Sequence, residues 1–281
     1  MVSNIKSVLV GITQESYEEN ERFSALPYAL SLAQQAGAHL TVQAASLKLV
    51  LTHAFVSDFA TGLVVEENQR LLALADAAAD RMQKDAEGAG VTCTAEGLSL
   101  SYPDLIESFA QQARLHDLAI LDAEPLALTA DRGLIEAALM RTGRPLIVVP
   151  PKCEKFLTDR VLVAWDGSAK AARAVNDALP FLQAAGSVEV VSVEGEKDLA
   201  DTVRGAEIAP HLARHGVKVT VEVLEAKNGD AAEALRRHAV YSQANLLVAG
   251  AFVHSRLHQA ILGGVTGSLL KTCPVPLFLS Y

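Results

Sequence analysis

The chain is poor in cysteine and aromatic residues, and it has no dense run of basic residues. Its three cysteines, Cys93, Cys153 and Cys273, are far apart and form no C-x-x-C pair that would indicate a metal or redox centre. They are typical of reduced thiols in a cytosol. The formal net charge of −9 disfavours binding to phosphate backbones and to anionic lipid. We therefore expect neither nucleic acid nor a membrane as a partner.

Long apolar runs are also missing. No segment reaches the roughly twenty consecutive apolar residues that a membrane-spanning helix needs, and the alanine-rich stretch at 71–79 is interrupted by Asp76. The first residues lead directly into a strand pattern, without the apolar core and cleavage site of a secretory signal. We therefore expect a cytoplasmic protein. Its 281 residues, half of them apolar, favour two domains of ordinary size.

The sequence contains two copies of one pattern. The run SVLVGIT at 7–13 matches RVLVAWD at 160–166, and LAILD at 118–122 matches LLVAG at 246–250. The later match has a shorter offset than the first, so the first copy carries extra residues, which we place between Leu47 and Glu66 as an exposed excursion. Pro150 and Pro151 stop the last strand of copy one. This division predicts domains at 1–150 and 158–281.

Within each copy, short β-rich runs alternate with helical patterns, which is typical of βαβ units and a parallel sheet. The fold class is therefore α/β. In copy two the expected strands are 160–165, 187–193, 217–224, 245–249 and 275–280, and a helix follows Ser168 as its N-cap. Further helices are expected at 65–89, 102–115 and 231–242.

Ligands of open parallel sheets bind beyond the carboxyl ends of the strands, which directs attention to two features of copy two. Asp166 ends the first strand and can accept hydrogen bonds from sugar hydroxyls or join the water shell of a metal; capping the next helix is an equally good interpretation. Gly263 and Gly264 precede a helix and can present amides to a phosphate. A tight turn would use the same glycines.

Other candidate functional residues are supported by weaker sequence signals. His211 and His215 have i, i+4 spacing, but no third ligand accompanies them, so we predict no metal site. Trp165 is better explained by packing than by stacking on a ligand. Ser168 lacks a G-x-S-x-G frame and no acid/base pair stands out. We predict no catalytic residue, although carboxylates distant in sequence can still meet in space.

Four stretches of the second copy together resemble the universal stress protein family, in a tandem form that covers nearly the whole chain. They are VLVAWDGS at 161–168, LLVAG at 246–250, HSRLHQAILGGVT at 254–266 and CPVPLFL at 273–279. The resemblance implies an open, five-stranded, Rossmann-like parallel sheet with helices on both faces in each domain. It also implies an ATP site built on a G-x-x-G-x9-G-[S/T] pattern, with an aspartate near the ribose and the end of the second strand at the adenine.

Carried over by position, the pattern is incomplete. It begins at Gly250, meets Val253 where a second glycine is expected, finds Gly263, and has Gly264 where a hydroxyl residue is expected. A β-branched residue resists positive φ and adds bulk to a phosphate loop, whereas Thr266 is near enough to replace the missing hydroxyl. The part of the family pattern that contacts the nucleoside is better preserved, because Asp166 and Val193 match the aspartate near the ribose and the strand end at the adenine. Neighbouring residues assigned to the same site are Ala164, Trp165 and Val265.

Copy one departs further from the family. Thr13 stands in place of the aspartate, Asp122 in place of the first glycine, and Leu139-Met140 in place of the glycine pair. An aspartate in a phosphate loop repels the ligand, so we expect copy one to be non-binding and structural. The resemblance further implies that the final strands, 145–149 and 275–280, pair across a pseudo-twofold axis and form a pseudo-dimer.

The resemblance implies a cytoplasmic stress-response regulator that binds ATP or another adenine nucleotide, with or without Mg²⁺, weakly or conditionally through copy two. One alternative is an interaction scaffold, or a sensor of another small ligand, that does not bind nucleotide. A second is a slow ATP hydrolase or nucleotidyl-transfer enzyme in which Asp166 places a metal. A homodimer is possible, and the sequence does not identify protein partners.

Overall fold

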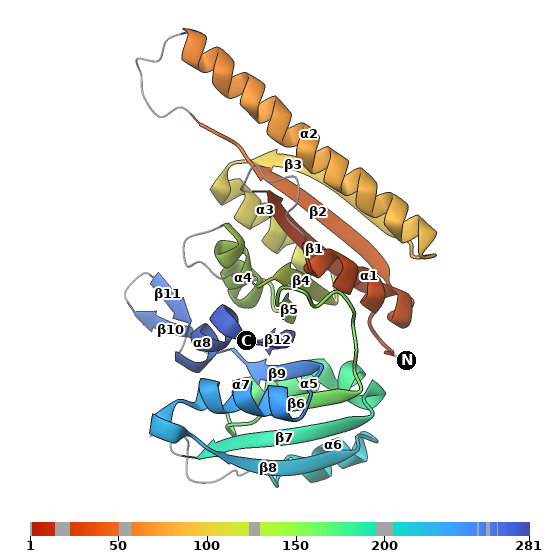
Figure 1. Ribbon diagram of the computed structural model, residues 1–281, viewed down its shortest axis with the longest axis vertical. Coiled ribbons are helices and arrows are strands. Elements are labelled where there is room, and N and C mark those ends of the chain that lie inside the picture. The colour runs from red at the N-terminus through yellow and green to blue at the C-terminus, as the bar shows by residue number, and fades with distance from the viewer. Residues whose placement is uncertain are drawn as a thin grey trace.

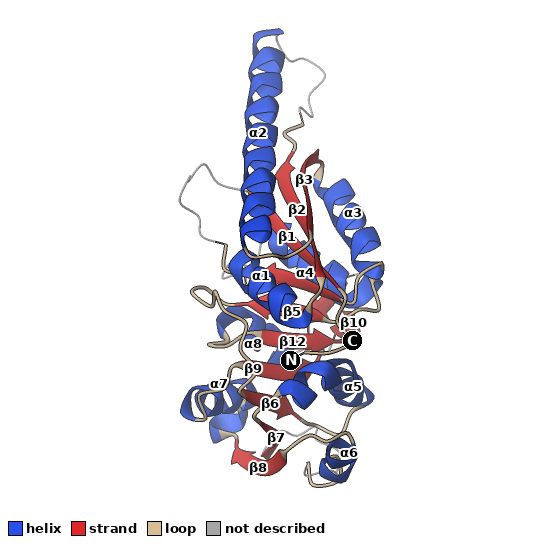
Figure 2. Cartoon of the chain, turned by 90° about the vertical axis from the view of Figure 1, so that its right-hand side faces the viewer, coloured by secondary structure: helices blue, strands red, loops and turns tan. Residues whose placement is uncertain are grey.

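The computed structural model describes residues 2–14, 23–50, 58–123, 130–194, 205–251, 253–256, 259–262 and 264–281. Ten strands form one sheet in the order β3-β2-β1-β4-β5-β12-β9-β6-β7-β8. Figure 1 shows these strands following one another along the long axis of the molecule, and Figure 2 shows helices covering both faces of the sheet.

The elements of the first half are β1 (Ser7–Gln14), α1 (Ala25–Ala36), β2 (His39–Leu47), α2 (Asp58–Gly88), β3 (Cys93–Leu100), α3 (Tyr102–Arg114), β4 (Leu118–Asp122), α4 (Ala130–Arg141) and β5 (Leu146–Val149). Those of the second half are β6 (Arg160–Ala164), α5 (Ala169–Ala184), β7 (Ser187–Glu194), α6 (Ala209–Arg214), β8 (Val219–Glu225), α7 (Ala231–Tyr241), β9 (Leu246–Gly250), α8 (Gly264–Thr272) and β12 (Leu277–Ser280). A short 3₁₀ turn, η1 (Lys227–Gly229), precedes α7.

Each half repeats the same strand order. Counted along the chain, both halves run third, second, first, fourth, fifth across the sheet, and their neighbouring strands are parallel. The halves meet where β5 and β12 pair antiparallel, with Leu277 opposite Val148 and Leu279 opposite Leu146. The predicted pairing of the two final strands is therefore confirmed.

The core has two layers, one on each face of the sheet. Alternate residues of a strand point to opposite faces, so Val8 and Val10 pack in one layer while Leu9 packs in the other. The first layer includes buried residues of α1, α2, α5 and α6, and the second includes buried residues of α3, α4, α7 and α8. The strands near the centre are buried on both faces, which explains their continuous apolar sequences.

A row of aromatic rings joins the two halves within the first layer. Tyr28 of α1 meets Phe156 of the connecting segment edge to face, with ring centroids 5.7 Å apart. Phe156 contacts Phe181 of α5 at 5.8 Å, and Phe181 contacts Phe278 of β12 at 5.6 Å. All four side chains are fully buried. The connecting segment is thus part of the core rather than a loose linker.

The predicted strands of copy two and the helices at 102–115 and 231–242 are confirmed to within about two residues, the usual uncertainty of such boundaries. One expectation needs correction: the helix expected at 65–89 begins earlier, at Asp58, so the excursion at 47–66 is helical from Asp58 onward. The segment after Gly250 contains two short strands, β10 (Val253–Arg256) and β11 (Gln259–Leu262), which were not expected. No helix within the described ranges is both long and apolar enough to cross a bilayer.

Candidate functional site

The strand order reverses between β9 and β6. From β6 the chain goes to β7 on one side, whereas β9 lies on the other side, with Val161 opposite Leu246 and Ala164 opposite Ala249. The loops that follow β6 and β9 therefore diverge at the carboxyl end of the sheet, and such reversals form the crevices where open α/β sheets bind ligands. Asp166 and Gly250 begin these two loops, so the structure brings the first predicted residues together.

The loop after β6 is organised by Asp166 and Ser168. The Oδ1 atom of Asp166 accepts a hydrogen bond from the Ser168 amide at 2.9 Å, and the Ser168 hydroxyl accepts one from the Ala171 amide at 3.1 Å. The predicted N-cap is thus confirmed, and Asp166 supports it from two residues upstream. A carboxylate can accept about four hydrogen bonds, so Asp166 keeps the capacity to accept from a ligand while it holds the turn.

Gly250 is required by the close approach of β9 to α5. A Cβ atom on this residue would lie 2.6 Å from the backbone nitrogen of Ala171 and 2.7 Å from the carbonyl carbon of Lys170. Both atoms belong to the first turn of α5, which cannot move aside as a flexible side chain would. The glycine therefore has a structural reason that is independent of any ligand.

The start of α8 is open. Gly264 is exposed, no atom of the described residues lies within 4 Å of the place where its Cβ would be, and the first turn of the helix contains no acidic side chain. These features suit an anion, because helix N-termini present unpaired amides and a positive partial charge. Thr266, by contrast, is only 3% exposed. Its burial argues against the expectation that its hydroxyl replaces the one missing at Gly264.

At the adjoining ends of β6 and β7, two buried polar atoms have no hydrogen-bond partner within the described residues. They are Nε1 of Trp165 and Oγ of Ser192. Each residue directly follows the aligned pair Ala164 and Val191, and the Trp165 amide bonds to the Val191 carbonyl at 2.8 Å. Leaving a buried polar group unpaired costs about 1–3 kcal/mol. A ligand at this edge could supply the partners.

Ser192 was not predicted, since a serine inside an apolar strand gives no signal of its own. Lys170 was not predicted either; it lies in the first turn of α5 with its Nζ atom 3.7 Å from the centre of the Tyr281 ring. Val193 and Trp165 are nearly buried, at 7% and 8% exposed, and pack in opposite layers of the core. The burial of Trp165 agrees with the interpretation of this residue as a packing side chain.

The phosphate loop of the family pattern has a different backbone here. Val253 is the first residue of β10 and pairs with Leu262 of β11 in a two-stranded antiparallel unit. A residue in a strand is extended, so Val253 does not supply the turn for which the pattern uses a glycine. Gly263 lies outside the described residues.

In the first half, a carboxylate occupies the position that Gly250 has in the second half. Ser24, the N-cap residue of α1, makes no side-chain cap, and the Oδ1 atom of Asp122 accepts a hydrogen bond from the Ala25 amide at 2.8 Å. Asp122 aligns with Gly250 in the repeat, so a carboxylate caps the first turn of α1 where the second half has no side chain. The prediction that Leu139 and Met140 replace the glycine pair is wrong, because both lie near the end of α4.

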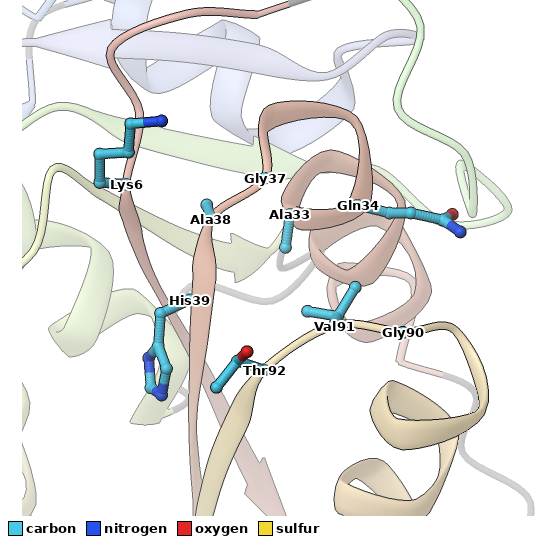
Figure 3. Close-up of a pocket in the computed structure, with 9 residues that line it drawn as sticks. All are labelled: Lys6, Ala33, Gln34, Gly37, Ala38, His39, Gly90, Val91 and Thr92. Carbon is cyan, nitrogen blue, oxygen red and sulfur yellow. The ribbon is translucent and has the colours of Figure 1, made fainter.

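A pocket of about 440 Å³ lies elsewhere, at the amino ends of β1, β2 and β3 (Figure 3). It is lined by Lys6, Ala33, Gln34, Gly37, Ala38, His39, Gly90, Val91 and Thr92. Helices α1 and α2 both end beside it, and helix C-termini carry negative partial charge. Because of this charge and its position on the sheet, the pocket is less suited to phosphate than the opposite edge.

His211 and His215 do lie together, with ring centres 4.7 Å apart. Across the part of the chain that the structure describes, however, no group of three or more potential metal ligands converges. The histidine pair therefore does not extend to a metal site of ordinary composition.

Comparison with protein families finds that residues 158–280 match the Universal stress protein family. The match lies wholly within the second half of the chain. A universal stress protein from Archaeoglobus fulgidus DSM 4304 is similar in structure over 97% of this chain and 95% of its own, with a TM-score of 0.67 and 16% identity. A functionally unknown protein from Pseudomonas aeruginosa PAO1 is similar over 98% and 92%, with a TM-score of 0.60 and 16% identity. No curated protein sequence matches.

At such low identity, the two solved structures establish the fold and nothing more. They do so for nearly the whole chain, including the first half, which the family model does not match. The two halves therefore share one tandem α/β fold, and the family match concerns the second half.

Proposed function

We propose that this chain is a tandem universal stress protein, a cytoplasmic, ligand-dependent regulator that binds an adenine nucleotide through its second half, residues 158–281. In this proposal the first half, residues 1–150, is a structural partner. The observation that carries the proposal is the reversal of strand order between β9 and β6, with Asp166 in the loop that follows β6.

The nucleoside part of the ligand fits the carboxyl ends of β6 and β7. Asp166 would accept hydrogen bonds from ribose hydroxyls, since its carboxylate can take more than the one bond to Ser168. The base would lie at the end of β7 beside Val193. Ala164 and Gly250 would form the floor between the two strands.

Fewer residues are placed to bind the phosphate part of the ligand. The amides of Gly264 and Val265 at the start of α8 would face an anion, and Lys170 would add a positive charge from the first turn of α5. The strand at Val253, however, gives no glycine turn to wrap the phosphates. We therefore expect an affinity in the high micromolar to millimolar range, with little difference between ATP, ADP and AMP and little effect of Mg²⁺.

A titration of the full chain with ATP tests the proposal. Trp165 is the single tryptophan, and it directly precedes Asp166, so its fluorescence reports on the site without a label, and calorimetry gives an independent affinity. We expect saturable binding that Asp166→Ala weakens at least tenfold, because about 1.4 kcal/mol corresponds to a factor of ten and a bond to a charged acceptor is worth that or more.

The matched control is Thr13→Ala, which changes the equivalent position of the first half and should leave the affinity unchanged. Asp166→Asn keeps an oxygen that can accept from the Ser168 amide but removes the negative charge. It therefore separates the effect of losing the contact with the ligand from the effect of losing the turn. Absence of heat and of fluorescence change up to millimolar ATP would refute the proposal. Turnover of many molecules per second would show an enzyme instead of a regulator.

A second candidate function follows from the β10–β11 unit. If this unit replaces the phosphate loop altogether, the same crevice would serve a small ligand without phosphate, or the protein would act as an interaction scaffold. Adenosine separates these outcomes: a nucleoside that binds as well as ATP indicates a site that does not use phosphate, and binding of neither indicates a scaffold.

A further inference from the structure

Helix α2 is much longer than the sheet edge that it covers. Its 31 residues span about 46 Å, whereas the eight residues of β3 span about 26 Å. Buried side chains along the helix begin only at Ala75 and continue at Ala79, Met82 and Ala86. From residue 59 to residue 74 none of the described side chains is buried. Both views show this first part of α2 projecting past the end of the sheet (Figures 1 and 2).

Asn68 connects the projecting part to the segment that follows β2. The side-chain oxygen of Asn68 accepts a hydrogen bond from the Leu49 amide at 2.8 Å, and its nitrogen donates to the Leu49 carbonyl at 3.0 Å. Asn68 lies on the same side of the helix as Ala75 and Ala79, since each residue adds 100°. The opposite side therefore points away from the sheet.

That outer side carries a regular seam. Phe59, Leu63, Glu66, Arg70, Ala73 and Ala77 follow one another at alternating steps of four and three residues, which is the spacing of helices that pair in coiled coils. All six are exposed, and Phe59 and Leu63 are 76% and 51% exposed. Large exposed apolar side chains spaced along one helix face are typical of an interaction surface.

The seam is complementary to itself when two copies run antiparallel. A twofold axis midway between Glu66 and Arg70 places Glu66 of each copy opposite Arg70 of the other. The same axis sets Leu63 against Ala73 and Phe59 against Ala77, so each large side chain meets a small one. A parallel arrangement would instead place like charges together, which is unfavourable.

We propose that two copies of this chain associate through the outer seam of α2 in an antiparallel helix pair. Arg70 already contacts Glu67 of its own helix at 3.1 Å, but a guanidinium has five N–H donors and can hold two carboxylates. The seam covers about five turns, which is a small interface, so the association is weak and depends on concentration. The proposal is independent of nucleotide binding.

Sedimentation equilibrium of the full chain, from low micromolar to several hundred micromolar, tests the proposal. We expect an average mass that rises from one chain towards two. Leu63→Glu should keep the protein monomeric throughout. Val65→Glu is the matched control, because Val65 is equally exposed, at 51%, yet lies off the seam; it should leave the association unchanged.

Charge exchange tests the antiparallel register. Glu66→Arg alone and Arg70→Glu alone should each be monomeric, because each brings like charges together across the axis. An equal mixture of the two variants should dimerise, and so should the chain that carries both changes. A wild-type chain that stays monomeric over the whole range would overturn the proposal, as would a double variant that fails to dimerise or a Val65→Glu variant that loses association.

Discussion

Replacing Gly250 by alanine tests how the candidate site is built. The added methyl group would lie 2.6 Å from the Ala171 nitrogen and 2.7 Å from the Lys170 carbonyl carbon, both in the backbone of α5. Contacts this short must be relieved by moving β9 away from α5, and overpacking of this kind costs about 1–3 kcal/mol, or more where backbone must move. We expect Gly250→Ala to lower the free energy of unfolding by at least about 2 kcal/mol in urea denaturation.

Gly264→Ala is the matched control, because it adds the same methyl group at the start of α8, where no atom of the described residues lies within 4 Å. Alanine is also the better helix former by about 1 kcal/mol in a helix interior, so this variant should be as stable as the wild type or slightly more stable. A Gly250→Ala protein within about 0.5 kcal/mol of the wild type would lie in the range of ordinary surface substitutions. That result would refute the packing argument.

Two further predictions concern Asp122 of the first half and the thiol of Cys273. Asp122→Ala removes the carboxylate that caps Ala25, so unfolding by urea should show a loss of about 1–2 kcal/mol, whereas Asp122→Asn, which keeps an acceptor oxygen, should lose less than half of that. Burial raises the pKa of Cys273 from 9.0 to about 11; at pH 8 its alkylation, followed by peptide mass spectrometry, should be about 100-fold slower than in denatured protein because the thiolate is the reactive form. The same raised pKa stabilises the fold fully below pH 9, and this contribution should disappear as the pH rises through 11. Equal alkylation rates in folded and denatured protein would contradict the burial of Cys273.

The repeat and the periodicity of apolar residues were enough to predict most of the sheet. Runs such as 246–250 are apolar throughout because they are buried on both faces, and this pattern is visible in a single sequence. The pairing of β5 with β12 was also expected, but only through the family resemblance. Periodicity says which residues are buried and does not say which strand lies beside which.

The start of α2 and the β10–β11 unit were not predicted, for different reasons. The outer face of α2 at Phe59 and Leu63 is apolar without being buried, so the pattern there does not resemble an amphipathic helix with one apolar stripe. In β10–β11, residues such as His254 and Arg256 have no strong strand preference, and pairing within a two-stranded unit is set by neighbours rather than by propensity.

The sequence predicted where the candidate site lies better than it predicted which contacts form there. Asp166 and Gly250 could be placed at the carboxyl ends of their strands from the βαβ pattern alone. The capping bond from Asp122 to Ala25 joins residues 97 positions apart, and no local pattern reveals such a contact. The same holds for the unpaired atoms of Trp165 and Ser192, which become neighbours only through the register of β6 and β7.

An NMR titration of the amide resonances of the full chain with ATP tests most directly whether the second half binds nucleotide. We predict shifts at the ends of β6, β7 and β9 and at the start of α8, including Asp166, Val193 and Gly264. We predict none at Thr13 and Asp122 of the first half. Shifts centred on Lys6, His39 and Thr92 would move the site to the opposite edge of the sheet, and shifts in neither place at millimolar ATP would contradict nucleotide binding altogether.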